Sequence, residues 1–121
     1  MATNVLTLAY LGDCVYELYI REYLIFQGIV KVNDLQKEAI KYVSAKAQAK
    51  YLRKLIDNEI LTKEELEIVY RGRNHKNNHK PKNTNIITYK NATGLEALIG
   101  YLKLNSRDER IDYIMNYIVG E

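Results

Sequence analysis

The sequence has little of what crosslinks a chain or interrupts a helix. Its 121 residues include one cysteine, one proline, six glycines and no tryptophan. A single cysteine excludes an internal disulfide framework and a cysteine-rich zinc site, and it suits a reducing compartment. The N-terminus lacks the basic start of a secretory signal, and no apolar run approaches the ~20 residues that span a membrane. We therefore expect a cytoplasmic protein with no membrane partner.

Acidic residues are absent from one long stretch of the chain. None lies between Glu67 and Glu96, and the rest of the chain has 12 basic and 15 acidic residues. The basic residues of the acid-free stretch are Arg71, Arg73, Lys76, Lys80, Lys82 and Lys90. The net charge of +3 is therefore concentrated in one segment. This distribution favours a segment that faces a polyanion over a generally basic protein.

Helical periodicity extends over almost the whole length. Apolar residues recur at three- and four-residue spacing, which predicts amphipathic helices. The length is typical of one domain, so we expect a single all-α unit over 1–121. Asn33 or Asp34 suits the N-cap of the second helix. The predicted helices cover about 4–27, 33–58, 62–70, 84–104 and 106–119.

Start and stop signals support these bounds. Gly28 follows the first periodic segment, where glycine commonly ends a helix. Thr62 with Glu65 has the spacing of a capping box, in which two side chains satisfy the free backbone N–H groups of a helix start. Ser106 with Glu109 has the same spacing. Both pairs therefore predict helix N-termini.

Two acidic residues lie inside apolar helical segments. Asp13 is the only charged residue among the first sixteen, and Glu96 is the only one in NATGLEALIGYL, residues 91–102. A buried carboxylate costs stability unless a partner compensates for it. If the two converge they are able to share a divalent cation, and Mg²⁺ suits such a site because it prefers oxygen ligands and retains several waters. Pairing with a basic side chain, or contact with solvent, is the alternative for each.

Several motifs resemble the ribonuclease III family. LAYLGDCVYE, residues 8–17, is similar to the family signature, commonly Leu-Glu-Phe-Leu-Gly-Asp followed by a small residue and Val. ATGLEALIGYL, residues 92–102, resembles the second acidic motif, Ala-Asp-x-x-Glu-Ala-Leu-Ile-Gly. The chain resembles most the Mini-III branch, which consists of the catalytic domain alone. The further segments shared with that branch are YELYIR (16–21), VSAKAQAK (43–50) and RGRN…PKNT (71–84).

The resemblance implies a fold, a reaction and a site. The fold is a compact, all-α ribonuclease III-like endonuclease domain that forms a homodimer. The reaction is magnesium-dependent hydrolysis of double-stranded RNA that leaves a 5′-phosphate, with Mn²⁺ able to substitute. Asp13 and Glu96 take the positions of catalytic residues that ligate the metal. Similarity to Mini-III points further to maturation of large-subunit ribosomal RNA precursors in a bacterial cytoplasm.

Two positions depart from the family pattern. The signature glutamate is Ala9 here, and the aspartate of the second motif is Thr93. We therefore expect one firmly held Mg²⁺ in place of two ions ~3.5–4 Å apart. Thr93 is able to orient a metal-bound water and Glu17 to support Asp13, although helix packing and pairing with Arg21 are their default interpretations. The departures leave an alternative, a catalytically silent module of the same fold that binds double-stranded RNA.

The segment at about 71–83, RGRNHKNNHKPKN, is the predicted RNA-binding loop. It is polar and basic and contains the only proline and both histidines, so we expect it to be exposed. Double-stranded RNA is recognised through phosphates and 2′-hydroxyls, largely without reading sequence. The candidate RNA contacts are Arg71, Arg73, Asn74, Lys76, Lys80 and Lys82. An ordinary solvated loop is the alternative.

Other reactive residues have simpler interpretations. Cys14 has no histidine near it in sequence, so we expect a buried packing residue. His75 and His79 have i,i+4 spacing but lack a third ligand, which favours RNA contact or solvation over zinc. The eleven tyrosines suggest a large aromatic contact surface that suits dimerisation.

Overall fold

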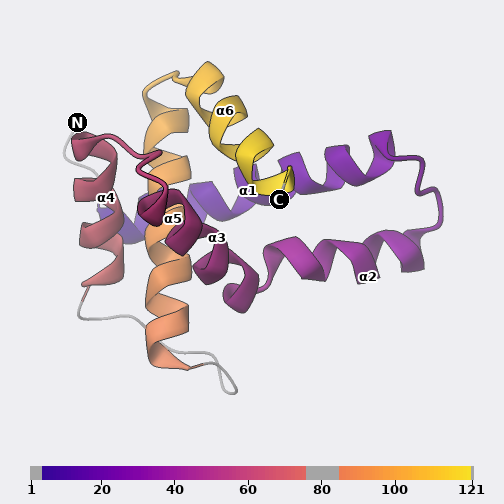
Figure 1. Cartoon of the computed structure of the whole chain (residues 1–121), viewed down its shortest axis with the longest axis horizontal. Helices are drawn as coiled ribbons and strands as arrows, with labels where there is room; N and C mark the ends of the chain where they lie inside the picture. The colour runs from indigo at the N-terminus through magenta and orange to yellow at the C-terminus, as the bar shows by residue number, and fades with distance from the viewer. Residues whose placement is uncertain (1–3, 76–84, 121) are drawn as a thin grey trace.

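The computed structural model describes residues 4–75 and 85–120, and within these ranges the chain forms six α-helices (Figure 1). They are α1 (Val5–Phe26), α2 (Val32–Val43), α3 (Ala45–Asp57), α4 (Lys63–Arg73), α5 (Ile86–Leu104) and α6 (Asp108–Val119). The prediction of an all-α domain is confirmed. No helix within the described residues is long and apolar enough to cross a membrane.

Helix α5 is the centre of the domain. Its buried residues occur on every side of the helix, as expected of a helix that is apolar all round. Helices α1, α3, α4 and α6 pack around it, and Figure 1 shows α5, in orange, crossing in front of α1. The largest core cluster draws on these helices through side chains such as Tyr16, Leu52, Leu98 and Ile114, each at most 2% exposed. Side chains on α5 and on the helices that pack against it are therefore positioned by a well-packed core.

Helices α1 and α2 form an arm that projects from the rest of the domain (Figure 1). They run antiparallel and are joined by a turn at Gly28, whose φ of 93° lies in the left-handed region that favours glycine. Gly28 thus ends the first helix as predicted. None of the residues of α2, all of which the structure describes, is buried. Val32 and Ile40 are 64% and 61% exposed, so the arm presents an apolar face.

The predicted helix over 33–58 is broken in two at Ser44. The backbone of Ser44 is extended, with φ −63° and ψ 153°, and its hydroxyl oxygen accepts a hydrogen bond of 3.1 Å from the backbone N–H of Ala47. Ser44 is therefore the N-cap of α3, and the break turns α3 away from the arm toward α5. The expected N-cap at Asn33 or Asp34 was wrong, because α2 begins upstream with Lys31 in that position.

The two predicted capping boxes have different outcomes. At the start of α4 the prediction is confirmed: Thr62 Oγ1 accepts from the Glu65 N–H at 3.1 Å, and Glu65 Oε1 accepts from the Thr62 N–H at 2.8 Å. The box of Ser106 with Glu109 was wrong, and Arg107 occupies the N-cap position of α6. Ser106 has a φ of 57° and forms the left-handed turn that ends α5.

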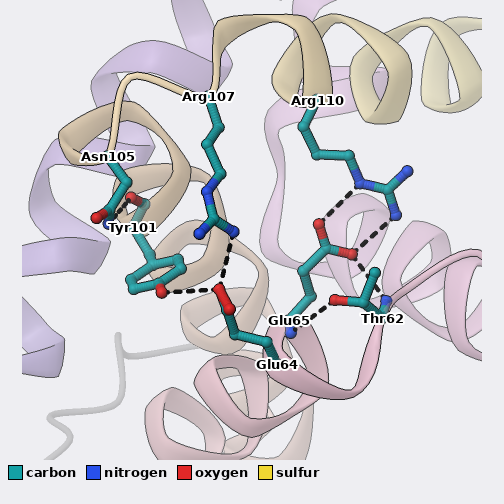
Figure 2. Close-up of polar contacts among 7 residues, drawn as sticks. All are labelled: Thr62, Glu64, Glu65, Tyr101, Asn105, Arg107 and Arg110. Atoms are coloured by element: carbon teal, nitrogen blue, oxygen red, sulfur yellow. Dashed lines mark hydrogen bonds and ion pairs between the residues drawn. The ribbon is translucent and has the colours of Figure 1, made fainter.

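An ion pair between the buried Glu65 and the partly buried Arg110 fastens the start of α4 to α6 (Figure 2). Arg110 donates from Nε to Glu65 Oε2 at 2.7 Å and from Nη2 to Glu65 Oε1 at 2.8 Å, and Nη2 also donates to the Ile60 carbonyl at 2.6 Å. Burial raises the pKa of Glu65, but the hydrogen bonds from Arg110 and from the Thr62 N–H outweigh it and leave this pKa below its ordinary value. The carboxylate is therefore ionised and fully paired.

Glu64 makes a second connection beside this pair (Figure 2). Its Oε1 accepts from the Tyr101 hydroxyl and from Arg107 Nη1, each at 2.8 Å. The Asn105 amide donates to the Tyr101 carbonyl at 2.8 Å. These contacts hold the end of α5 against α4.

Candidate functional site

Asp13 of α1 and Glu96 of α5 are neighbours because the two helices cross at glycines. A Cβ atom on Gly12 would lie 1.7 Å from the Glu96 carbonyl oxygen, and one on Gly100 would lie 1.9 Å from the Leu8 carbonyl oxygen. Only residues without a Cβ allow backbones to approach this closely. The crossing explains the Gly-Asp pair in the middle of α1, since Gly12 makes the contact that brings Asp13 to Glu96.

The two carboxyl groups interact directly. Burial is the largest cause that raises the pKa of Glu96, and the charge of Asp13 and a hydrogen bond between the two side chains raise it further, to about 8. Asp13 is exposed, whereas Glu96 is partly buried. At neutral pH Glu96 therefore retains a proton that faces the Asp13 carboxylate. The pair thus combines a partly buried acid, Glu96, with an exposed one, Asp13.

This pair fits a magnesium ion better than zinc. No group of three or more His, Cys, Asp or Glu side chains that could hold a metal occurs within 4–75 and 85–120, and zinc sites take three or four such ligands. Mg²⁺ needs only one or two carboxylates, because it keeps several waters. A divalent cation between Asp13 and Glu96 would also replace the shared proton and neutralise the repulsion that raises the pKa of Glu96.

The two positions that depart from the ribonuclease III pattern are used for packing. Ala9 is 7% exposed and lies in an apolar cluster with Ile68 and Ala97. Thr93 is 4% exposed, and its hydroxyl donates to the Tyr89 carbonyl one turn earlier, at 3.0 Å. The Thr93 proton is thus engaged within α5, and neither position adds a charge to the Asp13–Glu96 pair.

The α1 surface next to Asp13 is more open than the sequence predicts. Cys14 is exposed, so the expectation of a buried packing residue was wrong. The reason is that none of the described residues covers this face of α1: Tyr10 and Leu18, four residues either side of Cys14, are 83% and 54% exposed. Glu17, on the same helix, forms the expected ion pair with Arg21, at 3.0 Å.

The first three residues of the predicted basic loop, 71–73, belong to helix α4, so the loop begins later than predicted. Arg71 and Arg73 are exposed in the last turn of α4, and Asn74 follows as its C-cap. The helix continues this far because Gly72 packs on α5: a Cβ atom there would lie 3.0 Å from both Gly94 Cα and Ala97 Cβ. Both arginines therefore lie at the end of α4 that packs on α5, the helix that carries Glu96. Lys76, Lys80 and Lys82 lie outside the described residues.

Two hollows flank this end of α4. Arg71, Asn74 and His75 line an open depression of about 780 Å³ beside the start of α1. Arg53 and Arg73 line a second one, of about 200 Å³, between α3, α4 and α5. Each hollow also has one acidic residue in its lining, Glu67 in the first and Asp57 in the second. Arginines from α3 and α4 meet at the second hollow, where they are able to contact an anionic group such as a phosphate.

Sequence reasoning missed Gln48. It lies on α3, is 1% exposed and interacts with Glu96. A signal was available, because Gln48 is in line with the buried residues Leu52 and Leu55 at i, i+4 and i+7. A glutamine on the apolar stripe of a helix is a buried polar group that needs a partner.

Comparison with known proteins gives a consistent match. A family model of the ribonuclease III domain matches residues 6–107. The chain is 43% identical over 116 residues to the Mini-ribonuclease 3 of Streptococcus pneumoniae, covering 96% of this chain and 91% of that protein. It is 51% identical over 113 residues to the Mini-ribonuclease 3 of Brevibacillus brevis, covering 93% and 83%. A crystal structure of a Fusobacterium nucleatum protein superposes with a TM-score of 0.86 at 34% identity, covering 98% of this chain and 93% of the other.

Proposed function

The chain belongs to the ribonuclease III family, and we propose that it is a magnesium-dependent endoribonuclease that hydrolyses double-stranded RNA. The observation that carries the proposal is the meeting of Asp13 and Glu96 where α1 crosses α5, with exposed arginines at the end of α4. A module that only binds RNA has no use for an acid whose pKa is raised to about 8 by burial and a second carboxyl.

Each residue of the site has a role in this reaction. Bound Mg²⁺ supplies polarisation of the scissile phosphoryl group and a lowered pKa for an attacking water. Asp13 and Glu96 would hold the ion through carboxylate oxygens, and Mn²⁺ is expected to substitute because it accepts the same ligands. Attack at phosphorus breaks the bond to the 3′ oxygen and leaves a 5′-phosphate and a 3′-hydroxyl. Thr93 and Glu17 stay candidates to support the site through water or through Asp13.

RNA binding in this proposal rests on the basic end of α4 and the segment after it. Arg71, Arg73 and Asn74 are exposed and able to contact phosphates and sugars. Lys76, Lys80 and Lys82 extend the same run of positive charge along the sequence. Such contacts position the sugar-phosphate backbone of an RNA duplex and do not distinguish its bases. The affinity should therefore depend on the shape of the duplex and on the salt concentration.

The active unit in the proposal is a homodimer formed through the arm. α1 and α2 enclose an apolar groove of about 510 Å³ lined by residues such as Leu24, Ile25, Leu35 and Ile40. Tyr10 and Leu18, on either side of Cys14, are further exposed apolar residues of α1, and exposed apolar surface that gathers in this way marks an interaction site. Ile40→Glu is expected to give a monomer in sedimentation, whereas Leu104→Glu, on the exposed end of α5, is expected to remain a dimer. If both stay dimeric, the arm is not the interface.

The cellular role that we propose is maturation of large-subunit ribosomal RNA in the cytoplasm. It is supported by the similarity to two Mini-ribonuclease 3 proteins over most of the chain. Cleavage of a duplex taken from a ribosomal RNA precursor, compared with an unrelated duplex of equal length, tests this preference. Equal cleavage rates on the two duplexes would contradict the ribosomal role and would indicate a general endonuclease for double-stranded RNA.

The central experiment is cleavage of a duplex RNA with Mg²⁺ or with a chelator. The wild type is expected to cut only with the metal, and Asp13→Asn and Glu96→Gln are expected to bind the duplex but not cut it. Arg73→Ala is the contrasting variant, with weaker binding and an intact metal site. A wild type that binds without cutting would favour the silent RNA-binding module, and unchanged cleavage by both acid variants would remove Asp13 and Glu96 from the mechanism.

A further inference from the structure

We propose that Gln48 is a positioning residue that holds the Glu96 carboxylate for metal binding by donating a hydrogen bond from its side-chain amide. This inference rests on the proposed function, because it concerns the same acid pair. Gln48 comes from α3, whereas Glu96 and Asp13 come from α5 and α1. The site would thus be built from three helices.

The first observation is an orphan donor. Gln48 is 1% exposed, and its Nε2 has no hydrogen-bond partner of normal geometry among the described residues. Buried amide groups are almost always paired, because an unpaired donor loses its bonds to water without replacement. A side chain of this kind at a core position therefore indicates an acceptor that becomes available in another state of the site.

The second observation is the identity of the neighbouring group. The buried Gln48 side chain interacts with Glu96, the carboxyl group that also contacts Asp13. Donation from an amide N–H stabilises a carboxylate and does nothing for a protonated hydroxyl that already donates elsewhere. Gln48 is therefore placed to donate a hydrogen bond to the Glu96 carboxylate when this carboxylate binds a cation. Such a hydrogen bond orients a metal-ligating carboxylate.

The third observation is that this site has few other means of fixing its ligands. The two family positions that would add carboxylates are Ala9 and Thr93, and both are used for packing. With Asp13 exposed, the orientation of the ion depends on Glu96. α3 supplies the missing restraint because Leu52 and Leu55, on the stripe of Gln48, are at most 2% exposed and anchor the helix in the core.

The test compares Gln48→Met with wild type in the absence of RNA. Methionine keeps the length and apolar bulk of the side chain and removes the N–H donor. We expect the dissociation constant for Mn²⁺, measured from the free-ion signal in electron paramagnetic resonance, to rise about 10-fold or more. The melting temperature without metal is expected to stay unchanged or increase, because the variant removes an unpaired buried donor. A purely structural glutamine would give the opposite pair of results.

Two further variants complete the design. Gln27→Met, about 20 Å along α1 from Asp13, is the matched control and is expected to bind Mn²⁺ like the wild type. Gln48→Glu keeps the shape but offers oxygen in place of the amide, so we expect it to weaken binding too; tighter binding would mean that residue 48 ligates the ion and would overturn the proposal.

Failure of the inference and failure of the proposed function give different results. If the wild type binds Mn²⁺, Asp13→Asn loses it and Gln48→Met retains it within twofold, the role of Gln48 is refuted and the nuclease proposal stands. If the wild type itself binds no Mn²⁺, both are refuted.

Discussion

Replacing Glu96 with glutamine should make the metal-free protein more stable at alkaline pH while it destroys the proposed site. The pKa of Glu96 rises from its ordinary value of 4.5 to about 8 in the folded chain. The folded state therefore binds more protons than the unfolded state between these two values. Folding stability consequently falls as the pH rises through this window and is level above it. Glutamine has no such charge to bury.

The size of the effect follows from the width of the window. One pH unit between the two pKa values costs about 1.4 kcal/mol. Between about pH 6 and pH 8 the wild type should therefore lose up to roughly 3 kcal/mol relative to Glu96→Gln. Water entry around the ionised pair reduces this figure, and we expect about 2 kcal/mol. A change in packing caused by the substitution alters the free energy of unfolding equally at both pH values. It therefore cancels when the value at one pH is subtracted from the value at the other.

Urea unfolding followed by circular dichroism, with a chelator present and at one fixed protein concentration, measures this difference. A fixed concentration is needed because dimerisation would contribute to the apparent stability. Glu109→Gln, an exposed carboxylate on α6, is the control and should follow the wild type at both pH values. Addition of Mg²⁺ should restore the wild type at the higher pH and leave Glu96→Gln unchanged. Parallel pH profiles of wild type and Glu96→Gln would refute the buried acid pair.

Three other substitutions test separate parts of the structure. Arg110→Met should cost about 3–5 kcal/mol in urea unfolding, and less in acid, because the pKa of its partner Glu65 is lowered and this stabilisation disappears as Glu65 protonates. Gly12→Ala should lower the melting temperature and abolish cleavage together, since its Cβ would lie 1.7 Å from the Glu96 carbonyl oxygen; a normal melt would contradict the crossing. Arg73→Ala should weaken RNA binding and reduce the slope of log affinity against log salt by about 1, whereas an unchanged slope would place Arg73 off the RNA.

The acid pair was accessible to sequence reasoning because isolated charges in apolar helices are conspicuous. Convergence of Asp13 and Glu96 was not, since periodicity places a residue on a face of its own helix and says nothing about the neighbouring helix. Gly12 and Gly100 indicate this convergence, because glycines in two buried helices allow close backbone contact. The family resemblance identified Asp13 and Glu96 without this physical reason.

Local errors have local causes. Ser44 was read as part of one helix, although a serine that precedes alanine is also a good N-cap, and only the packing of α3 on α5 decides between the two. Cys14 was expected to be a buried packing residue because no histidine lies near it in the sequence. Within the described residues, one side of α1 packs on the domain, whereas Tyr10, Cys14 and Leu18 on the other side are exposed. Apolar content alone does not distinguish these two sides.

The packing around the acid pair explains why the proposed site has only two carboxylates. A carboxylate at position 9 would enter the apolar cluster of Ile68 and Ala97 without a partner, and one at position 93 would lie in a segment that is 4% exposed. Close packing of α1 and α4 on α5 occurs at glycines, and the contact at Gly12 also brings Asp13 to Glu96. In the proposed site, positions 9 and 93 are thus part of the packed core and supply no ligand for a second ion. We therefore expect a second ion only where a substrate phosphate supplies the missing negative charge.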